Sequence, residues 1–146
     1  TQNVLVEEEI NGVHVKRLPR LVHIFSQNVV RGLCKELKQS RAQIYHLHLP
    51  NPLAVLAYLK AKPKGKLIIT WHSDIIRQEF LIPLYRPFLN LILQRADRII
   101  VTSPNYLSSS LYLKDSKSLA FKLNAVRTIA LLRNSEFSSL AAISVI

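Results

Sequence analysis

One pattern of apolar and polar positions occurs three times between residues 44 and 105. Each copy begins with an apolar run, which is followed by a side chain that can cap a helix and then by the start of a segment that can form one. The three runs are short and rich in β-branched and aromatic residues, as buried parallel strands are. They span residues 44–49, 67–72 and 98–102. Strands that alternate with helices predict an α/β fold, in which right-handed crossovers build a parallel sheet with flanking helices.

Helices are predicted after the first two runs, at about residues 52–61 and 78–95. Each of the three runs is followed by an oxygen-bearing side chain that can cap a helix. These side chains are Asn51 after the first run, Ser73 and Asp74 after the second, and Ser103 after the third. Pro83 and Pro87 predict that the second helix is kinked or split. That helix is apolar on more than one face, which favours burial; insertion into an anionic membrane surface is the alternative.

Two further elements are predicted ahead of the first run. Asn11 and Gly12 separate two apolar-containing segments, and this pair predicts an amino-terminal β-hairpin because both residues tolerate positive φ. Residues 28–39 carry apolar side chains at helical spacing, with basic side chains on the other faces. They predict an amphipathic helix.

Beyond Asp115 the pattern is lost. Residues 121–132 are compatible with a further helix, but the serine-rich positions after them show no hydrophobic period. We therefore predict a partial domain at residues 1–115 and a divergent tail at residues 116–146, whose structure the sequence leaves open.

Composition limits the class of protein. The chain has 146 residues, of which 49% are hydrophobic and 20% charged, so it can bury the core of one globular domain. It starts at Thr1 and contains no methionine, which we interpret as a fragment of a longer protein. Its single cysteine, Cys34, forms no internal disulfide and fits a cytoplasmic location. The formal net charge of +11 favours anionic partners, such as phosphates, acidic lipids or nucleic acid.

Polar side chains follow each predicted strand, at the edge where open parallel sheets bind ligands. They are His48 and Asn51 after the first strand, His72, Ser73 and Asp74 after the second, and Ser103 and Asn105 after the third. The second group lies beside a predicted helix amino terminus, which favours anions. A purely structural interpretation stays open, in which these side chains cap helices and His72 is merely polar at a strand end.

The spacing disfavours several kinds of site. His46 and His48 share one face of a strand, as some metal ligands do, but no cysteine or carboxylate pattern completes a metal site. We expect no metal, and His46 is then a hydrogen-bonded core histidine. Ser73 lacks the glycine-flanked elbow of a serine hydrolase. The three glycines form no phosphate-binding loop, so we predict no cofactor site.

Three segments carry a resemblance to a known family. They read His46-Leu47-His48-Leu49-Pro50-Asn51-Pro52, Thr70-Trp71-His72-Ser73-Asp74-Ile75-Ile76-Arg77 and Ala96-Asp97-Arg98-Ile99-Ile100-Val101-Thr102-Ser103-Pro104-Asn105. In this order and spacing they resemble the amino-terminal, acceptor-side domain of family 4 glycosyltransferases of the GT-B fold. The resemblance implies a Rossmann-like domain that is one half of a two-domain enzyme, with the donor-binding domain missing from this chain.

The resemblance also implies roles for individual residues. His72 matches the catalytic histidine, which positions the reacting sugar and stabilises charge near its hydroxyls. Preorganised polar groups suit glycosyl transfer, because positive charge develops on the sugar and negative charge on the departing phosphate. The implied substrate-binding side chains are Asn51, Ser73, Asp74, Arg77, Ser103 and Asn105. No metal or other cofactor is implied, since the nucleotide-sugar is itself the donor substrate.

The expected function of the parent protein is therefore retaining transfer of a hexosyl group from a nucleotide-sugar to a lipid-linked or polysaccharide acceptor. We expect it in the cytoplasm, peripherally attached at the inner face of the cell membrane, and we expect the fragment alone to be inactive. Two alternatives are a non-catalytic basic binding module and a truncated remnant that no longer folds stably. Nucleic acid is not the expected partner, because the aromatic residues do not interleave with basic ones as a stacking platform requires.

Overall fold

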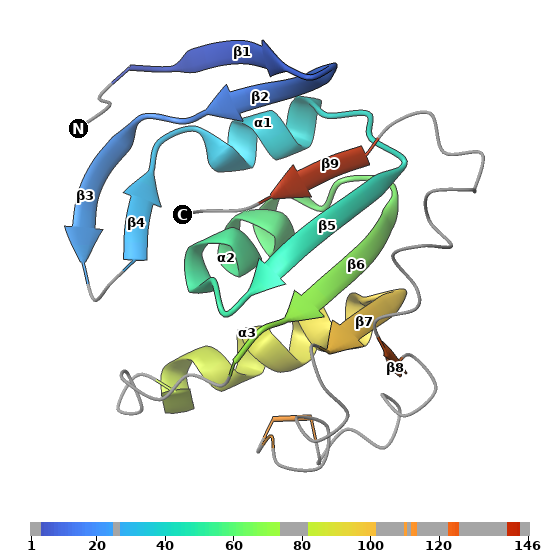
Figure 1. The fold of residues 1–146 in the computed structure, drawn as a ribbon. Coiled ribbons are helices and arrows are strands. Elements are labelled where there is room, and N and C mark those ends of the chain that lie inside the picture. Colours follow the sequence, from blue (N-terminus) through green and yellow to red (C-terminus); the bar gives the residue numbers. More distant parts are fainter. Residues whose placement is uncertain are drawn as a thin grey trace.

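The computed structural model describes residues 4–24, 27–73, 82–101, 110, 112–113, 123–125 and 140–143. Within this part of the chain, two antiparallel hairpins precede a parallel sheet, and three helices pack on one face of that sheet (Figure 1). The predicted α/β class, with a Rossmann-like parallel sheet and an amino-terminal hairpin, is confirmed.

The sheet has five parallel strands in the order β8-β7-β6-β5-β9. Its central strands are β5 (Ile44–Leu49), β6 (Lys66–Trp71) and β7 (Arg98–Val101), and each begins at or next to the first residue that the sequence predicts. Two short strands from the predicted tail, β8 (Leu123–Ala125) and β9 (Leu140–Ile143), pair with β7 and β5. The tail thus extends the sheet on both sides.

Helices α1 (Leu33–Gln39), α2 (Pro52–Ala61) and α3 (Ile82–Arg95) contribute to the core on one face of the sheet, and α2 and α3 lie behind the strands in Figure 1. The strand side chains that meet them alternate along the chain, and Leu47 and Trp71 among them are completely buried. Burial of such large side chains stabilises the fold by about 1.5–3 kcal/mol each. The opposite face carries a smaller buried cluster of Ile44, Ile68 and Ile100.

The start of α2 follows the sequence prediction. Asn51 is buried, and its Oδ1 accepts a hydrogen bond from the N–H of Ala54 at 3.0 Å. Pro52 occupies the first turn, where a helix needs no backbone donor. The predicted capping role of Asn51 is confirmed, and the cap places the amino terminus of α2 directly after the carboxyl end of β5.

The amino-terminal hairpin is also confirmed. It joins β1 (Val6–Ile10) to β2 (Val13–Arg17) through the Asn11-Gly12 turn. The two turn residues have φ values of 51° and 78°. Positive φ at both positions gives the turn that matches the right-handed twist of the two strands.

The helix predicted at residues 28–39 is shorter in the structure. β4 (Gln27–Val30) pairs antiparallel with β3 (Arg20–Ile24), and this second hairpin was not predicted. The two β-branched valines of β4 suit a strand. Gly32, with a φ of 92°, separates this strand from α1. The prediction was therefore wrong for the part of the segment that precedes α1.

Two other helix predictions have mixed outcomes. The helix considered at residues 121–132 is wrong where the structure describes that segment, because Leu123–Ala125 forms a strand. The long second helix is confirmed from Ile82 onward, while residues 78–81 lie outside the described part. Pro87 lies inside α3, so this helix is not split there. The division of the chain at residue 115 stays a prediction.

Candidate functional site

The carboxyl ends of β5 and β6 meet at one edge of the sheet, where open parallel sheets bind ligands. In their register, His48 pairs with Thr70 and Leu49 with Trp71. The N–H of His72 donates to the carbonyl of Leu49 at 2.9 Å, so the ladder continues one residue beyond β6. The parallel pairing therefore brings His48 and His72 side by side at this edge.

Three imidazole rings form a row here, in which His48 contacts both His46 and His72. Its Nδ1 lies 2.9 Å from Nε2 of His72, and the two rings are nearly parallel, at 15°, with centroids 5.2 Å apart. The ring of His46 lies 4.5 Å from that of His48, measured between centroids. A hydrogen bond between two imidazole nitrogens needs one donor and one acceptor, so His48 and His72 share a single proton along this line.

The surroundings of His46 and His48 keep both rings uncharged at neutral pH. Burial, and then the neighbouring His48 and His72, lower the pKa of His46 to about 4. Burial, and then His72, lower the pKa of His48. His46 is also fixed by a hydrogen bond of 2.7 Å between its Nε2 and Oγ1 of the buried Thr70. At neutral pH this part of the edge is therefore polar without carrying a cluster of positive charges.

Acidification should destabilise the chain through His46. Its folded pKa of about 4 lies below the ordinary value of 6.5, so the unfolded chain binds more protons between these values. Its contribution to stability is complete above pH 6.5 and is lost as the pH falls towards 4. Because the ring is only partly buried, solvent screening reduces the expected loss to about 1–2 kcal/mol.

The measurement is urea unfolding at pH 7 and pH 4.5 for the wild type and His46→Gln. Glutamine places an amide near the position of Nε2, so it keeps a hydrogen-bonding group for Thr70 but does not titrate. Other acid-sensitive groups contribute to both proteins alike. The variant should lose about 1–2 kcal/mol less than the wild type on acidification, and equal losses in both proteins would contradict the assignment.

The structure describes three of the predicted site residues. His72 is exposed, and Ser73, which follows it, is half-buried. Asn51 lies at the same edge, with its side-chain oxygen engaged in the cap of α2. The other four lie outside the described residues: Asp74, Arg77, Ser103 and Asn105. The grouping of His72 and Asn51 at one edge follows from the strand register.

The contact between His48 and His72 was not predicted. The sequence placed each residue at the end of its own strand, and His46 was expected only as a core histidine. The missing information was the register of β5 against β6, which two strand patterns alone do not fix. Histidines two apart on one predicted strand, next to a parallel strand that ends in histidine, are the signal that points to such a cluster.

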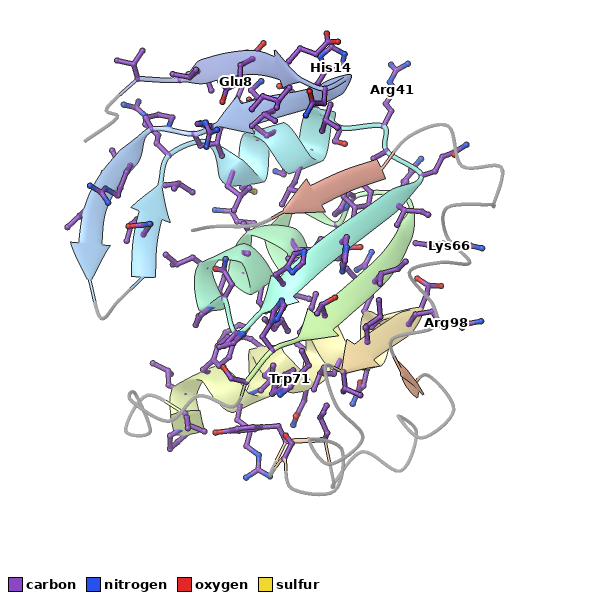
Figure 2. The ribbon with its side chains drawn as sticks, in the orientation of Figure 1. Glu8, His14, Arg41, Lys66, Trp71 and Arg98 are labelled. Carbon is purple, nitrogen blue, oxygen red and sulfur yellow. The ribbon has the colours of Figure 1, made fainter. Side chains whose placement is uncertain are left out.

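Basic side chains gather at the opposite edge of the sheet. Lys66 begins β6, Arg98 begins β7 and Arg41 precedes β5, while Trp71 marks the carboxyl end of β6 (Figure 2). The length of the strands separates these basic residues from the histidines. Within the described residues, these three cations therefore lie away from the candidate site.

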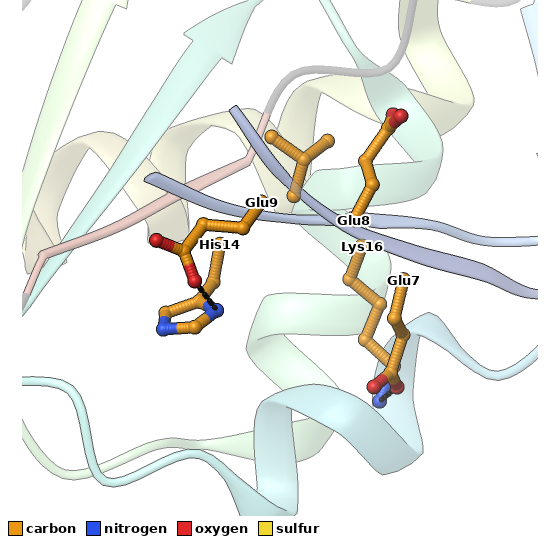
Figure 3. A pocket seen from close by; sticks show the side chains of 6 residues that line it. Glu7, Glu8, Glu9, His14 and Lys16 are labelled. Atoms are coloured by element: carbon orange, nitrogen blue, oxygen red, sulfur yellow. Dashed lines mark ion pairs between the residues drawn. The ribbon is translucent and has the colours of Figure 1, made fainter. Parts of the chain in front are cut away.

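A surface hollow of about 400 Å³ lies on the amino-terminal hairpin (Figure 3). It is lined by Glu7, Glu8, Glu9, His14, Val15 and Lys16. Several of these side chains pair with one another: Nδ1 of His14 lies 3.8 Å from the carboxylate of Glu9, and Nζ of Lys16 lies 2.8 Å from that of Glu7. Lys16 also lies 2.6 Å from the Glu36 carboxylate of α1. These charges hold the hairpin together and tie it to α1, and the hollow shares no residue with the histidine edge.

The described residues contain no group of three histidine, cysteine or carboxylate side chains placed to hold a metal ion. The geometry at the sheet edge offers hydrogen-bonding nitrogens instead. A neutral imidazole presents one donor and one acceptor, and a row of them can orient the hydroxyl groups of a ligand.

Comparison with known proteins agrees with the family resemblance that the sequence motifs carry. The sequence profile of Glycosyltransferase Family 4 matches residues 2–108. The D-rhamnosyltransferase WbpZ of Pseudomonas aeruginosa is 34% identical over 102 residues, which are 68% of this chain and 27% of that protein. The O-antigen chain mannosyltransferase C of Escherichia coli is 39% identical over 71 residues, which are 49% of this chain and 19% of that protein. No solved structure matches the chain.

Proposed function

Because the chain belongs to glycosyltransferase family 4, we propose that it forms the acceptor-side part of a GT-B enzyme. The enzyme transfers a hexosyl group from a nucleotide-sugar to a lipid-linked or polysaccharide acceptor. Its relatives, a rhamnosyltransferase and an O-antigen mannosyltransferase, support a sugar of this class. The chain spans about a quarter and a fifth of the length of these relatives, so the activity is proposed for the whole enzyme and the chain alone is expected to be inactive.

The observation that carries the proposal is the histidine pair at the carboxyl edge of β5 and β6. His72 is exposed at this edge, and its Nε2 is held by His48, so one ring nitrogen remains for a ligand. The amino terminus of α2 lies at the same edge, capped by Asn51. A helix amino terminus favours negative charge, and fixed polar groups stabilise charge that develops during transfer.

In this proposal His72 contacts the reacting sugar, and the neighbouring polar side chains bind substrate. Those side chains are Asn51, Ser73, Asp74, Arg77, Ser103 and Asn105. Asn51 has its side-chain oxygen in the cap, so its amide nitrogen is the group that it offers to a ligand. The nucleotide-sugar donor binds chiefly to the second domain of the GT-B pair.

A transfer assay with the full gene product tests the proposal. A panel of radiolabelled nucleotide-hexoses is incubated with the enzyme and with the lipid and polysaccharide fractions of its host. Label should appear in one of the acceptor fractions, and the 146-residue chain serves as the matched control that transfers none. Absence of transfer from every donor would refute the proposed activity, and transfer by the 146-residue chain would refute its inactivity.

Part of the proposal is peripheral attachment to the anionic inner face of the cell membrane. The outer side of α3 exposes Leu84, Phe88 and Leu91, with exposed fractions of 75%, 38% and 54%. Their spacing places them on one helix face, and the net charge of +11 favours an anionic surface. None of the described helices combines the length and apolarity that crossing a bilayer requires.

Substituting asparagine for both Leu84 and Leu91 should weaken binding to anionic vesicles about tenfold, because two apolar side chains no longer enter the interface. Co-sedimentation with vesicles of phosphatidylglycerol and phosphatidylcholine measures this. Leu21→Asn is the matched control, since Leu21 is equally apolar, is 62% exposed and lies on β3. Equal binding of the wild type and the double variant would contradict attachment through α3.

A further inference from the structure

The hydrogen bond between His48 and His72 can run in either direction, and the tautomers of the two rings decide which nitrogen donates. It joins Nδ1 of His48 to Nε2 of His72 at 2.9 Å. A neutral imidazole carries its proton on one nitrogen only, and an isolated ring prefers Nε2. If His72 donates from Nε2–H and His48 accepts at Nδ1, both rings keep this preferred form. The opposite direction would require the less favourable Nδ1–H form in both rings.

The ring of His48 is itself held in place. It lies against His46, with centroids 4.5 Å apart, and the Nε2 of His46 is fixed by Oγ1 of the buried Thr70 at 2.7 Å. The carbonyl of Leu49 binds the backbone N–H of His72 at 2.9 Å. Strand β5 thus fixes both the backbone and the ring of His72.

We propose that His48 is a positioning residue for His72: it accepts the Nε2–H of His72 and so leaves Nδ1 of His72 as the acceptor that faces the substrate. When the His72 ring is neutral, its Nδ1 accepts a hydrogen bond from a sugar hydroxyl. This inference rests on the proposed function for the identity of the ligand, while the tautomer of His72 is a property of the chain itself. His48 contacts no reacting atom in this scheme.

The first test is the tautomer of His72 in the 146-residue chain, measured by long-range ¹⁵N–¹H NMR of the imidazole rings. The expected result is a protonated Nε2 and an unprotonated Nδ1 on His72, in the wild type at neutral pH. A proton on Nδ1 of His72 would overturn the proposal. This measurement needs neither a variant nor sugar transfer.

Variants then test the cause. His48→Asn keeps an acceptor near the position of Nδ1, and should preserve the tautomer of His72. His48→Leu removes the acceptor, so the Nδ1–H tautomer of His72 should appear as the minor form that an isolated imidazole shows. His14→Asn, on the exposed hairpin, is the control and should change nothing at His72. An unchanged His72 in His48→Leu would overturn the proposal.

Kinetics of the full gene product separate this inference from the proposed function. His48→Leu should lower kcat about tenfold with little change in KM, and His48→Asn should restore most of it. An active enzyme that is indifferent to His48→Leu overturns the positioning role. A protein with the expected tautomer but no transfer activity refutes the proposed function and supports the hydrogen-bond assignment.

Discussion

Alanine in place of Gly65 is expected to lower the free energy of unfolding by about 3–5 kcal/mol, a large part of the 5–15 kcal/mol that stabilises a typical domain. Gly65 has a φ of 152°, which side chains rarely tolerate. A Cβ there would lie 2.8 Å from the carbonyl oxygen of Ala42 and 2.9 Å from the ring of Tyr45. Tyr45 is completely buried, and its hydroxyl donates to the carbonyl of Ser40, so its ring has little room to move.

Gly12→Ala is the matched control for this prediction. Gly12 also has a positive φ, of 78°, but an added Cβ would meet no atom within 4 Å. Gly12→Ala should therefore lower the free energy of unfolding by only about 1 kcal/mol, the cost of a positive φ for a residue with a Cβ. Urea unfolding followed by circular dichroism measures both variants. Similar losses at the two positions would show that the packing of Gly65 against the start of β5 matters less than its φ.

Removal of the His72 ring is expected to lower the kcat of the full gene product about 10²–10³-fold. Loss of one preorganised hydrogen-bonding group at a reacting centre has an effect of this size. The side chain is exposed, and its backbone N–H, which extends the ladder to β5, is unaffected by the substitution. His72→Ala should therefore unfold at nearly the same urea concentration as the wild type.

The control is His14→Ala, which removes an exposed imidazole from the hairpin. It should retain full transfer activity. Steady-state kinetics with the donor identified in the transfer assay measure both variants. Full activity of His72→Ala would exclude a role of His72 at the reacting centre, whereas a rise in KM with unchanged kcat would assign it to ground-state binding.

The central part of the fold could be predicted from the sequence because local signals agree there. The apolar runs that became β5, β6 and β7 are bounded by capping residues, and the Asn11-Gly12 pair specifies its turn by φ alone. Strand β4 was missed because Val29 and Val30 also fit the helical period of residues 28–39, and only Gly32 marked the break. β8 and β9 were missed because strands of three or four residues carry too few positions to show a period.

The location of the candidate site was predictable, but its internal geometry was not. The rule that ligands bind beyond parallel strand ends selected His48, Asn51 and His72 from the sequence. The contact of His48 with His72 depends on the register in which His48 pairs with Thr70. That register comes from packing of the sheet against the helices, since a slip by one residue would turn the buried side chains outward.

The pairing partners of β5 also bear on the order in which the chain folds. On one side Ile44 pairs with Lys66, across a short crossover through α2; on the other side it pairs with Leu140, near the end of the chain. Closing a longer loop costs more chain entropy, so the β5-α2-β6 unit should form well before β9 joins. Pulse-labelled hydrogen exchange would show this as protection of β5 and β6 before β9. Protection of β9 at the same time as β5 and β6, or before them, would contradict it. All three histidines of the candidate site lie within this unit or directly after it, so the site takes shape on the part of the sheet that assembles first.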